Sequence, residues 1–266
     1  MIAGSDSREK RFGLLGHDIT YTLSPIIHSA IFKKSKIKAS YSVVDVGQDK
    51  FQETIRDMVT GYDGFNITKP YKSMALKFVK KLSPEAKKCQ NINTVFGNTG
   101  YNTDYSAITS IFRHKFGNLE GGKCTIFGSG SAATTSAVAF GEMGNSLTII
   151  CRNPGEGRKI ADHLCGIGLG KPDIIGLQYA REVDSDVVVN AISSGNIEFP
   201  RITCEVAVNF NYGERGNNFY DSVMSYHGKI TGEEILLAQA IDAEQIWTGI
   251  RTEITWEEIF SVKQPR

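Results

Sequence analysis

The sequence has few cysteines, and their positions form no recognised metal-binding or disulfide pattern. Its five cysteines are scattered over 266 residues, and no two of them form a Cys-x-x-Cys pair. The five histidines complete no zinc-binding pattern with them. We therefore predict that the protein has no metal site, that its cysteines are structural thiols, and that it is cytoplasmic.

An excess of charge of either sign is also missing, as is a long apolar run. The formal net charge is +1, which gives no electrostatic reason to expect nucleic acid or an anionic membrane as a partner. No apolar run is long enough to span a bilayer. A small-molecule substrate is therefore the predicted partner, and the sequence leaves open whether the protein is a monomer or a homodimer.

What the sequence does contain is apolar segments in an α/β order. Apolar residues make up 41% of the chain, which is enough for a packed core. Because helical patterns separate the strand-like runs, and the later runs are continuously apolar, we expect an α/β fold whose second domain has a parallel sheet covered on both faces. The strand-like runs are residues 11–15, 41–46, 64–67 and 92–96 in the first part, then 124–127, 147–151, 186–190 and 206–210.

A polar turn after the third of these runs presents a lysine. Asn66 and Thr68 lead into Pro70, which blocks continuation of the strand and stiffens the turn that carries Lys72. Further along the chain, a second polar turn ends in Asp104. A lysine held by a carboxylate can give a proton to a carbonyl oxygen as hydride arrives, and can accept it in reverse. Which group carries the proton stays open, and the alternative is that both are ordinary surface charges.

A glycine-rich turn follows the first apolar run of the second part and opens a helical stretch. Gly128 permits a tight turn, Gly130 lets the backbone approach a pyrophosphate, and Ala133 is small enough for helix–strand packing. An ordinary strand-to-helix turn could show the same pattern. The next strand-like run is followed by Arg152, where an NAD-selective site would place an acid. Because a guanidinium suits a 2′-phosphate, NADP is the predicted cofactor.

The order of these motifs resembles the shikimate dehydrogenase family over nearly the whole chain, from about residue 11 to residue 260. The family's carboxylate-binding motif is similar to Thr22-Leu23-Ser24-Pro25 followed by His28. Its Asn-x-Thr-x-Pro-x-Lys motif is similar to residues 66–72. Three further motifs match residues 92–94 (Ile-Asn-Thr), residues 102–104 (Asn-Thr-Asp) and residues 190–195 (Asn-Ala-x-Ser-Ser-Gly).

The resemblance implies a fold, a reaction and a set of site residues. It implies a substrate domain at residues 1–104, a Rossmann-like NADP-binding domain at residues 105–232, and C-terminal helices at residues 233–266 that return to the first domain. It implies NADP-dependent, reversible reduction of 3-dehydroshikimate to shikimate in aromatic amino-acid (chorismate) biosynthesis, with Lys72 and Asp104 as the catalytic pair. The residues implied to bind substrate are Thr22, Ser24, Thr68, Asn93, Tyr212 and Gln239. Those implied to bind the cofactor are Gly128, Ser129, Gly130, Ser131, Ala132, Arg152, Asn153, Arg158, Asn190 and Ala191.

Several positions depart from the family's pattern. Thr22 adds a methyl group where serine is usual, and Lys69 stands where a β-branched apolar residue is usual. Asn209 stands where aspartate is frequent, and Glu233 and Glu234 replace a glycine-rich entry to the last long helix. These differences leave open a dehydrogenase of quinate or another cyclic hydroxy acid. A non-catalytic NADP-binding module is a further alternative, whereas the absence of Tyr-x-x-x-Lys disfavours a short-chain dehydrogenase.

Overall fold

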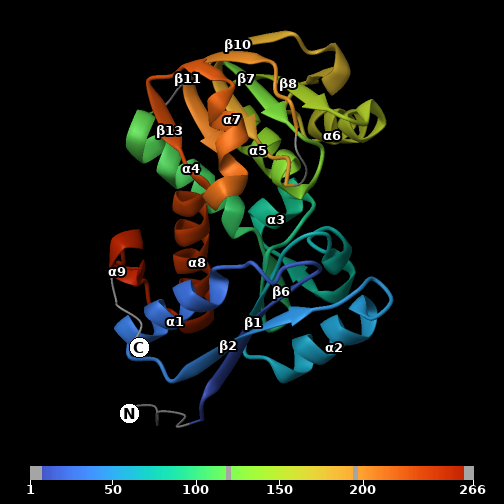
Figure 1. The fold of residues 1–266 in the computed structure, drawn as a ribbon. Helices are drawn as coiled ribbons and strands as arrows, with labels where there is room; N and C mark the ends of the chain where they lie inside the picture. The colour runs from blue at the N-terminus through green and yellow to red at the C-terminus, as the bar shows by residue number, and fades with distance from the viewer. Residues whose placement is uncertain (1–7, 118–120, 194–196, 261–266) are drawn as a thin grey trace. The chain divides into compact units, whose positions relative to one another are not determined.

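The computed structural model describes residues 8–117, 121–193 and 197–260. The chain divides into two compact units, and each is built on a sheet of its own (Figure 1). The first unit contains the chain up to Ala86, Asn91–Thr103 and the chain from Gln239 onward. The second unit contains Lys87–Gln90 and Asp104–Ala238.

The sheet of the first unit has the strand order β2-β1-β3-β5-β6-β4. β1 pairs in parallel with β2 and β3, whereas β5 pairs antiparallel with β3 and β6. The four strands expected in this part of the chain are present, but the two-residue β4 and three-residue β6 are too short to show a period in the sequence. The strands are β1 (Lys10–Gly16), β2 (Ala39–Asp45), β3 (Phe65–Ile67), β4 (Lys81–Leu82), β5 (Thr94–Phe96) and β6 (Thr99–Tyr101).

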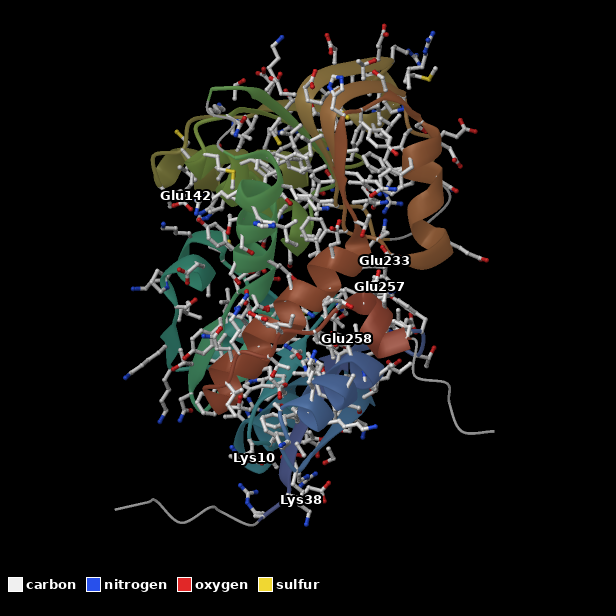
Figure 2. All side chains as sticks on the ribbon, turned by 90° about the vertical axis from the view of Figure 1, so that its left-hand side faces the viewer. Lys10, Lys38, Glu142, Glu233, Glu257 and Glu258 are labelled. Atoms are coloured by element: carbon white, nitrogen blue, oxygen red, sulfur yellow. The ribbon has the colours of Figure 1, made fainter. Side chains whose placement is uncertain are left out.

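Helices of the first unit bury an aromatic cluster against this sheet. Phe12 of β1 stacks on Trp247 of α8, with ring centroids 4.7 Å apart, and Phe32 of α1 stacks on Phe12. Lys34 of α1 forms an ion pair of 2.8 Å with Glu258 of α9, which is labelled in Figure 2. The helical segments here are α1 (Ser24–Lys34), α2 (Phe51–Gly61), the 3₁₀ turn η1 (Met74–Phe78), the last part of α8 (Gly232–Thr248) and α9 (Trp256–Phe260).

The sheet of the second unit is parallel throughout, in the order β12-β11-β10-β7-β8-β9, with β13 beside β11. Figure 1 labels β7, β8, β10, β11 and β13 of this sheet. The prediction of a parallel sheet in this part of the chain is therefore confirmed. Four of its strands were expected, and three short ones (β9, β12 and β13) were not. The strands are β7 (Lys123–Phe127), β8 (Ser146–Cys151), β9 (Asp173–Gly176), β10 (Glu182–Asn190), β11 (Arg201–Asn209), β12 (Val223–Ser225) and β13 (Gly228–Ile230).

Alternate residues of β10 pack on opposite faces of this sheet. Val187 and Val189 belong to the apolar cluster that contains Phe140, whereas Val188 belongs to the cluster that contains Phe219. Successive side chains of a strand point to opposite faces, so a continuously apolar run marks a strand buried on both sides. The remaining α-helices of the described residues are α3 (Pro84–Cys89), α4 (Thr103–Phe116), α5 (Ser131–Glu142), α6 (Pro154–Gly166) and α7 (Asn217–Asp221).

All five cysteines lie in the described residues; none forms a disulfide, and all but Cys165 are buried. Cys124 and Cys151 lie inside β7 and β8, where they pack as small apolar groups. Burial raises the pKa of the Cys204 thiol to about 11, so that this group stays protonated. Within the three described ranges, none of the helices has both the length and the apolar character that crossing a membrane requires.

Candidate active site

Two hydroxyl groups at the start of α1 are joined to each other. The Thr22 hydroxyl donates to the Ser24 hydroxyl at 3.1 Å, and the Ser24 backbone N–H donates to Thr22 Oγ1 at 3.3 Å. Ser24 is buried and Thr22 is half-buried. Burial raises the pKa of the Tyr41 hydroxyl, and hydrogen bonding with Ser24 opposes part of this rise. The structure thus places the two predicted carboxylate-binding residues beside each other and adds Tyr41.

The turn that carries Lys72 is fixed by contacts on both sides. Tyr71 is fully buried, stacks on Phe51 at 4.2 Å between centroids, and donates its hydroxyl to Val46 O at 2.7 Å. The carbonyl of Lys72 accepts from the N–H of Ile92 at 3.0 Å. The Lys72 side chain is half-buried and starts from a backbone that has little freedom. A general acid or base benefits from such a fixed origin.

Asn93 links the loop before β5 to the start of α4. Its Oδ1 accepts from the Thr103 backbone N–H at 2.8 Å and from the Thr103 hydroxyl at 3.1 Å. Thr103 also approaches Gln239 Oε1 at 3.5 Å, so that two predicted substrate-binding residues share one neighbour. Asp104 follows directly as the second residue of α4 and is 6% exposed. The positive end of the helix dipole favours a carboxylate at this position.

The Asn66 amide connects these two sets of side chains. Its Oδ1 accepts from the Tyr41 hydroxyl at 2.8 Å, and its Nδ2 donates to Asn93 O at 3.2 Å and to Thr94 Oγ1 at 3.0 Å. A continuous hydrogen-bond network therefore runs through the first unit from the Ser24 region to Asn93. Tyr41 and Thr94 were not predicted as site residues, because each reads in the sequence as an ordinary strand residue.

A buried histidine and a buried glutamate lie next to this network. His28 Nδ1 is 3.5 Å from Glu244 Oε2, and both side chains are 0% exposed. Burial lowers the pKa of His28 to about 3, against a smaller opposing effect of hydrogen bonding with Asn66. Burial also raises the pKa of Glu244 to about 8, and Lys10 opposes part of that rise. His28, which follows the Thr22–Pro25 motif in the sequence, stacks on Tyr41, at 4.2 Å between ring centroids.

Tyr212 lies in the second unit, on a loop that the start of α8 holds in place. Glu233 Oε1 accepts from the backbone N–H of Gly213 at 2.9 Å, and Figure 2 labels Glu233 on this helix. Gly232 packs so closely that an added Cβ would lie 2.3 Å from Asn211 O. The two glutamates at the start of α8 therefore have structural partners, since Glu234 accepts from the Thr231 N–H at 2.9 Å as in a capping box.

The glycine-rich turn lies where β7 ends and α5 begins. Gly128 has φ +119°, and a Cβ there would lie 3.0 Å from Ala191 O, so both backbone conformation and space require glycine. Gly130 is the N-cap residue of α5, and an added Cβ there would meet nothing within 4 Å. Its backbone is therefore open to a ligand. Ser129, Ser131 and Ala132 are half-buried around it, at a helix N-terminus that suits a phosphate.

Arg152 lies at the end of β8 and lines a cavity of about 490 Å³. Arg181 lines the same cavity and was not predicted, because it lies in an irregular segment without a motif. Asn153 caps α6, with Oδ1 accepting from the Gly155 N–H at 2.9 Å, while Arg158 is exposed on α6 and is not among the cavity's lining residues. The lining residues are Arg152, Leu177, Gln178, Ala180, Arg181, Glu198, Phe199 and Pro200.

The Asn190 amide is used inside the protein. Its Nδ2 donates to Asn209 Oδ1 at 3.0 Å, and its Oδ1 accepts from the Ile192 N–H at 3.1 Å. Asn209 Oδ1 also accepts from the Asn211 N–H at 3.1 Å, so the asparagine joins the ends of β10 and β11. Any contact that Asn190 and Ala191 make with a cofactor would involve the backbone. Ser194 and Gly195, which complete the matched turn, lie outside the described residues.

Comparison with known proteins identifies the family. A family model described as the shikimate dehydrogenase substrate binding domain matches residues 14–95. A shikimate dehydrogenase from Sulfurisphaera tokodaii is 35% identical over 244 residues, which cover 90% of each chain. A shikimate dehydrogenase (NADP(+)) from Saccharolobus islandicus is 33% identical over 242 residues, which cover 90% of this chain and 89% of the relative. The chain belongs to the shikimate dehydrogenase family.

A solved structure of another shikimate dehydrogenase has the same fold. Shikimate 5-dehydrogenase from Thermus thermophilus, crystallised with NADP(H) and shikimate, has a TM-score of 0.75 and 24% sequence identity. The likeness covers 92% of this chain and 95% of that one. The two-domain α/β fold predicted for this member of the family is therefore confirmed.

The departures of this chain from the shikimate dehydrogenase pattern fit into the structure without disturbing the turns around them. Lys69 places its ammonium group 5.5 Å from the centre of the Tyr21 ring, and its carbonyl accepts from the His17 N–H at 3.1 Å. A cation over an aromatic face is a favourable contact.

Within the described parts of the chain, no group of three or more histidine, cysteine, aspartate or glutamate side chains is placed to hold a metal ion.

Proposed function

We propose that this protein catalyses the NADP-dependent, reversible reduction of 3-dehydroshikimate to shikimate in the biosynthesis of chorismate and the aromatic amino acids. The observation that carries the proposal is similarity to shikimate dehydrogenases over 90% of the chain, together with the first unit's hydrogen-bond network, which joins Thr22 and Ser24 through Tyr41 to Asn66 and Asn93. We further propose that it acts in the cytoplasm as a monomer or homodimer, with residues 1–104 and 233–266 serving the substrate and residues 105–232 serving NADP.

In this proposal the first unit recognises the substrate by its hydroxyl and carboxylate groups. Thr22 and Ser24 would donate to the substrate carboxylate, and Tyr212, which belongs to the second unit, is proposed as a substrate-binding residue on the family resemblance alone. Because Asn93 Oδ1 is used by Thr103, its amide nitrogen is the group that would reach a ring hydroxyl. Thr68 and Gln239 would take the remaining hydroxyl groups. Such donors around a small polar ligand provide specificity because a ligand that lacks one hydroxyl leaves a buried partner unpaired.

Proton transfer is assigned to Lys72 and Asp104. NADPH, when bound, supplies a hydride to the carbonyl carbon. Lys72 would give a proton to the carbonyl oxygen in the same step. Asp104 would orient the lysine and accept a hydrogen bond from a ring hydroxyl. In the oxidation of shikimate the same pair would take the hydroxyl proton. The fixed backbone on both sides of Lys72 supports this assignment, because a positioned acid needs a stable origin.

The second unit fits NADP. The open backbone at Gly130 and the N-terminus of α5 would bind the pyrophosphate, with Gly128, Ser129, Ser131 and Ala132 forming the turn around it. Arg152 would bind the 2′-phosphate. Arg181, which lines the same cavity as Arg152, supplies a second guanidinium for it.

A related substrate is the main alternative within the family. Thr22 introduces a methyl group beside Ser24, which favours testing quinate or another cyclic hydroxy acid along with shikimate. The alternative in which the protein is not an enzyme is a non-catalytic NADP-binding protein. It would bind NADP but turn over none of these acids.

The proposal is tested by following NADP reduction with shikimate, with quinate and with neither. We expect turnover with shikimate, and a loss of at least about a hundredfold in turnover in Lys72→Ala, the lower end of general acid–base contributions. Lys77→Ala, an exposed lysine on the neighbouring 3₁₀ turn, is the matched control and should retain activity. Turnover with quinate but not with shikimate would show that quinate is the substrate. Full activity in folded Lys72→Ala would overturn the mechanism.

A further inference from the structure

The pair formed by His28 and Glu244 is a buried polar group that the proposed reaction does not use. His28 Nδ1 lies 3.5 Å from Glu244 Oε2, in a cluster that includes Phe32, Tyr41 and Trp247. No well-formed hydrogen bond is made by either ring nitrogen or either carboxylate oxygen with any described residue. Polar atoms in such surroundings are costly unless they satisfy each other.

Burial favours an uncharged form of this pair, and the one charged group that acts on it, Lys10, opposes this only in part. Lys10 acts on Glu244 from β1, and the Tyr41 hydroxyl faces it from β2. A glutamate anion in this cluster would have no close hydrogen-bond donor besides the imidazole. A protonated Glu244 can instead donate its proton to His28 Nδ1 without placing any charge in the core. A single proton then forms a hydrogen bond that satisfies a polar atom of each buried residue.

The side on which the imidazole carries its own hydrogen follows from this arrangement. If Nδ1 accepts from Glu244, the hydrogen of a neutral ring is on Nε2. The Asn66 side chain interacts with the imidazole, and its Oδ1 accepts from the hydroxyl of Tyr41, whose ring stacks on His28. With its oxygen held by the Tyr41 hydroxyl, Asn66 presents its nitrogen to Asn93 O and Thr94 Oγ1.

We propose that His28 and protonated Glu244 form a positioning pair that fixes the Asn66 amide and, through it, the Asn93 loop at the substrate site. This inference rests on the proposed function only for the identity of the substrate. Neither residue of the pair touches the substrate in this scheme. Their effect passes through two asparagine side chains whose oxygen and nitrogen ends must be oriented correctly.

Two substitutions of Glu244 separate hydrogen bonding from packing. Glu244→Gln keeps a donor of nearly the same shape, whereas Glu244→Leu keeps the volume and removes the donor. Asp242→Asn is the matched control on the same helix, because Asp242 pairs with Arg251 at the surface instead. We expect the leucine variant to raise KM for shikimate roughly three- to tenfold, with a smaller change in kcat, which corresponds to one misplaced hydrogen bond. The glutamine and Asp242→Asn variants should stay within about twofold of the unaltered protein.

Nitrogen NMR on the ligand-free protein tests the pair without any assay of activity. We expect His28 to be neutral at pH 7 with its hydrogen on Nε2, and we expect the Asn66 side-chain amide protons to exchange faster with solvent in Glu244→Leu than in Glu244→Gln. An imidazolium signal from His28 at pH 7, or equal Asn66 exchange in the two variants, would overturn the proposal. Because the NMR of the unaltered protein needs neither a variant nor turnover, it decides the pair even if shikimate is not the substrate.

Discussion

Replacing Glu244 by glutamine should change how the stability of the protein depends on pH. In the unfolded chain, Glu244 loses its proton above its ordinary pKa of 4.5, whereas burial holds the proton in the folded protein up to about pH 8. The folded state therefore binds more protons between these two values. It follows that the free energy of unfolding falls as pH rises from 4.5 to about 8 and is unaffected by this group above that. Glutamine has no proton to lose, so the variant lacks this fall.

The size of the effect follows from the gap between the two pKa values. Each unit of that gap is worth about 1.4 kcal/mol, so about 2.5 units between pH 4.5 and pH 7 give about 3 kcal/mol. We expect Glu244→Gln to match the unaltered protein near pH 4.5 and to exceed it by about 3 kcal/mol at pH 7. His28 contributes in the other direction, because its lowered pKa removes stability as pH falls below 6.5. That contribution is present in both proteins and cancels in the difference.

Urea unfolding at several pH values between 4.5 and 8.5 measures this difference. Both tryptophans, Trp247 and Trp256, belong to the first unit, so their fluorescence follows the unit that contains Glu244. The Asp242→Asn protein serves as the control and should parallel the unaltered protein. A stability difference that does not grow with pH, or a glutamine variant that is less stable at pH 7, would refute the reasoning. Glu244 would then be ionised and paired with a charged His28.

Three further predictions concern the proposed cofactor residue Arg152, the start of α8 and the binding of the substrate carboxylate. Arg152→Ala should weaken the binding of NADP roughly ten- to a hundredfold and change the binding of NAD little, because a charge-assisted contact is lost. Cofactor titration measures both affinities, with Lys159→Ala on α6 as the control. Equal weakening of the binding of both cofactors would contradict this prediction. Gly232→Ala should destabilise the protein by about 1–3 kcal/mol in thermal unfolding, because its Cβ would lie 2.3 Å from a backbone oxygen, whereas Gly166→Ala, with nothing within 4 Å, should not. Ser24→Ala should chiefly raise KM for shikimate, since the carboxylate does not react; unchanged affinity in a titration would remove Ser24 from the site.

Much of the second unit was determined by local features of the sequence. Continuously apolar runs predicted β7, β8, β10 and β11 because such strands are buried on both faces and need apolar residues at every position. The turn at Gly128 was readable because its φ of +119° is one that glycine adopts at little cost. Arg152 was readable because it follows a recognisable strand. In each case the physical requirement falls on residues that are adjacent in the chain.

The first unit shows what local features leave undetermined. The two-residue strand β4 is stabilised only by its pairing with β6, so no period in the sequence marks it. Glu244 lies at the same helical spacing as the buried Ala240, Ala243 and Trp247, which would have indicated a buried acid, but nothing in the sequence indicated its partner.

Tertiary structure alone decided which polar groups meet. His28 and Glu244 come from opposite ends of the chain, and their shifted pKa values arise from burial that only the packed helices α1 and α8 create. Arg181 lines the same cavity as Arg152, and it lies on the segment that follows β9, the strand that pairs with β8. Sequence motifs therefore predicted the groups that we propose act on a ligand, since those are presented by short turns. The groups that hold them in place depend on contacts between distant segments, which local patterns do not contain.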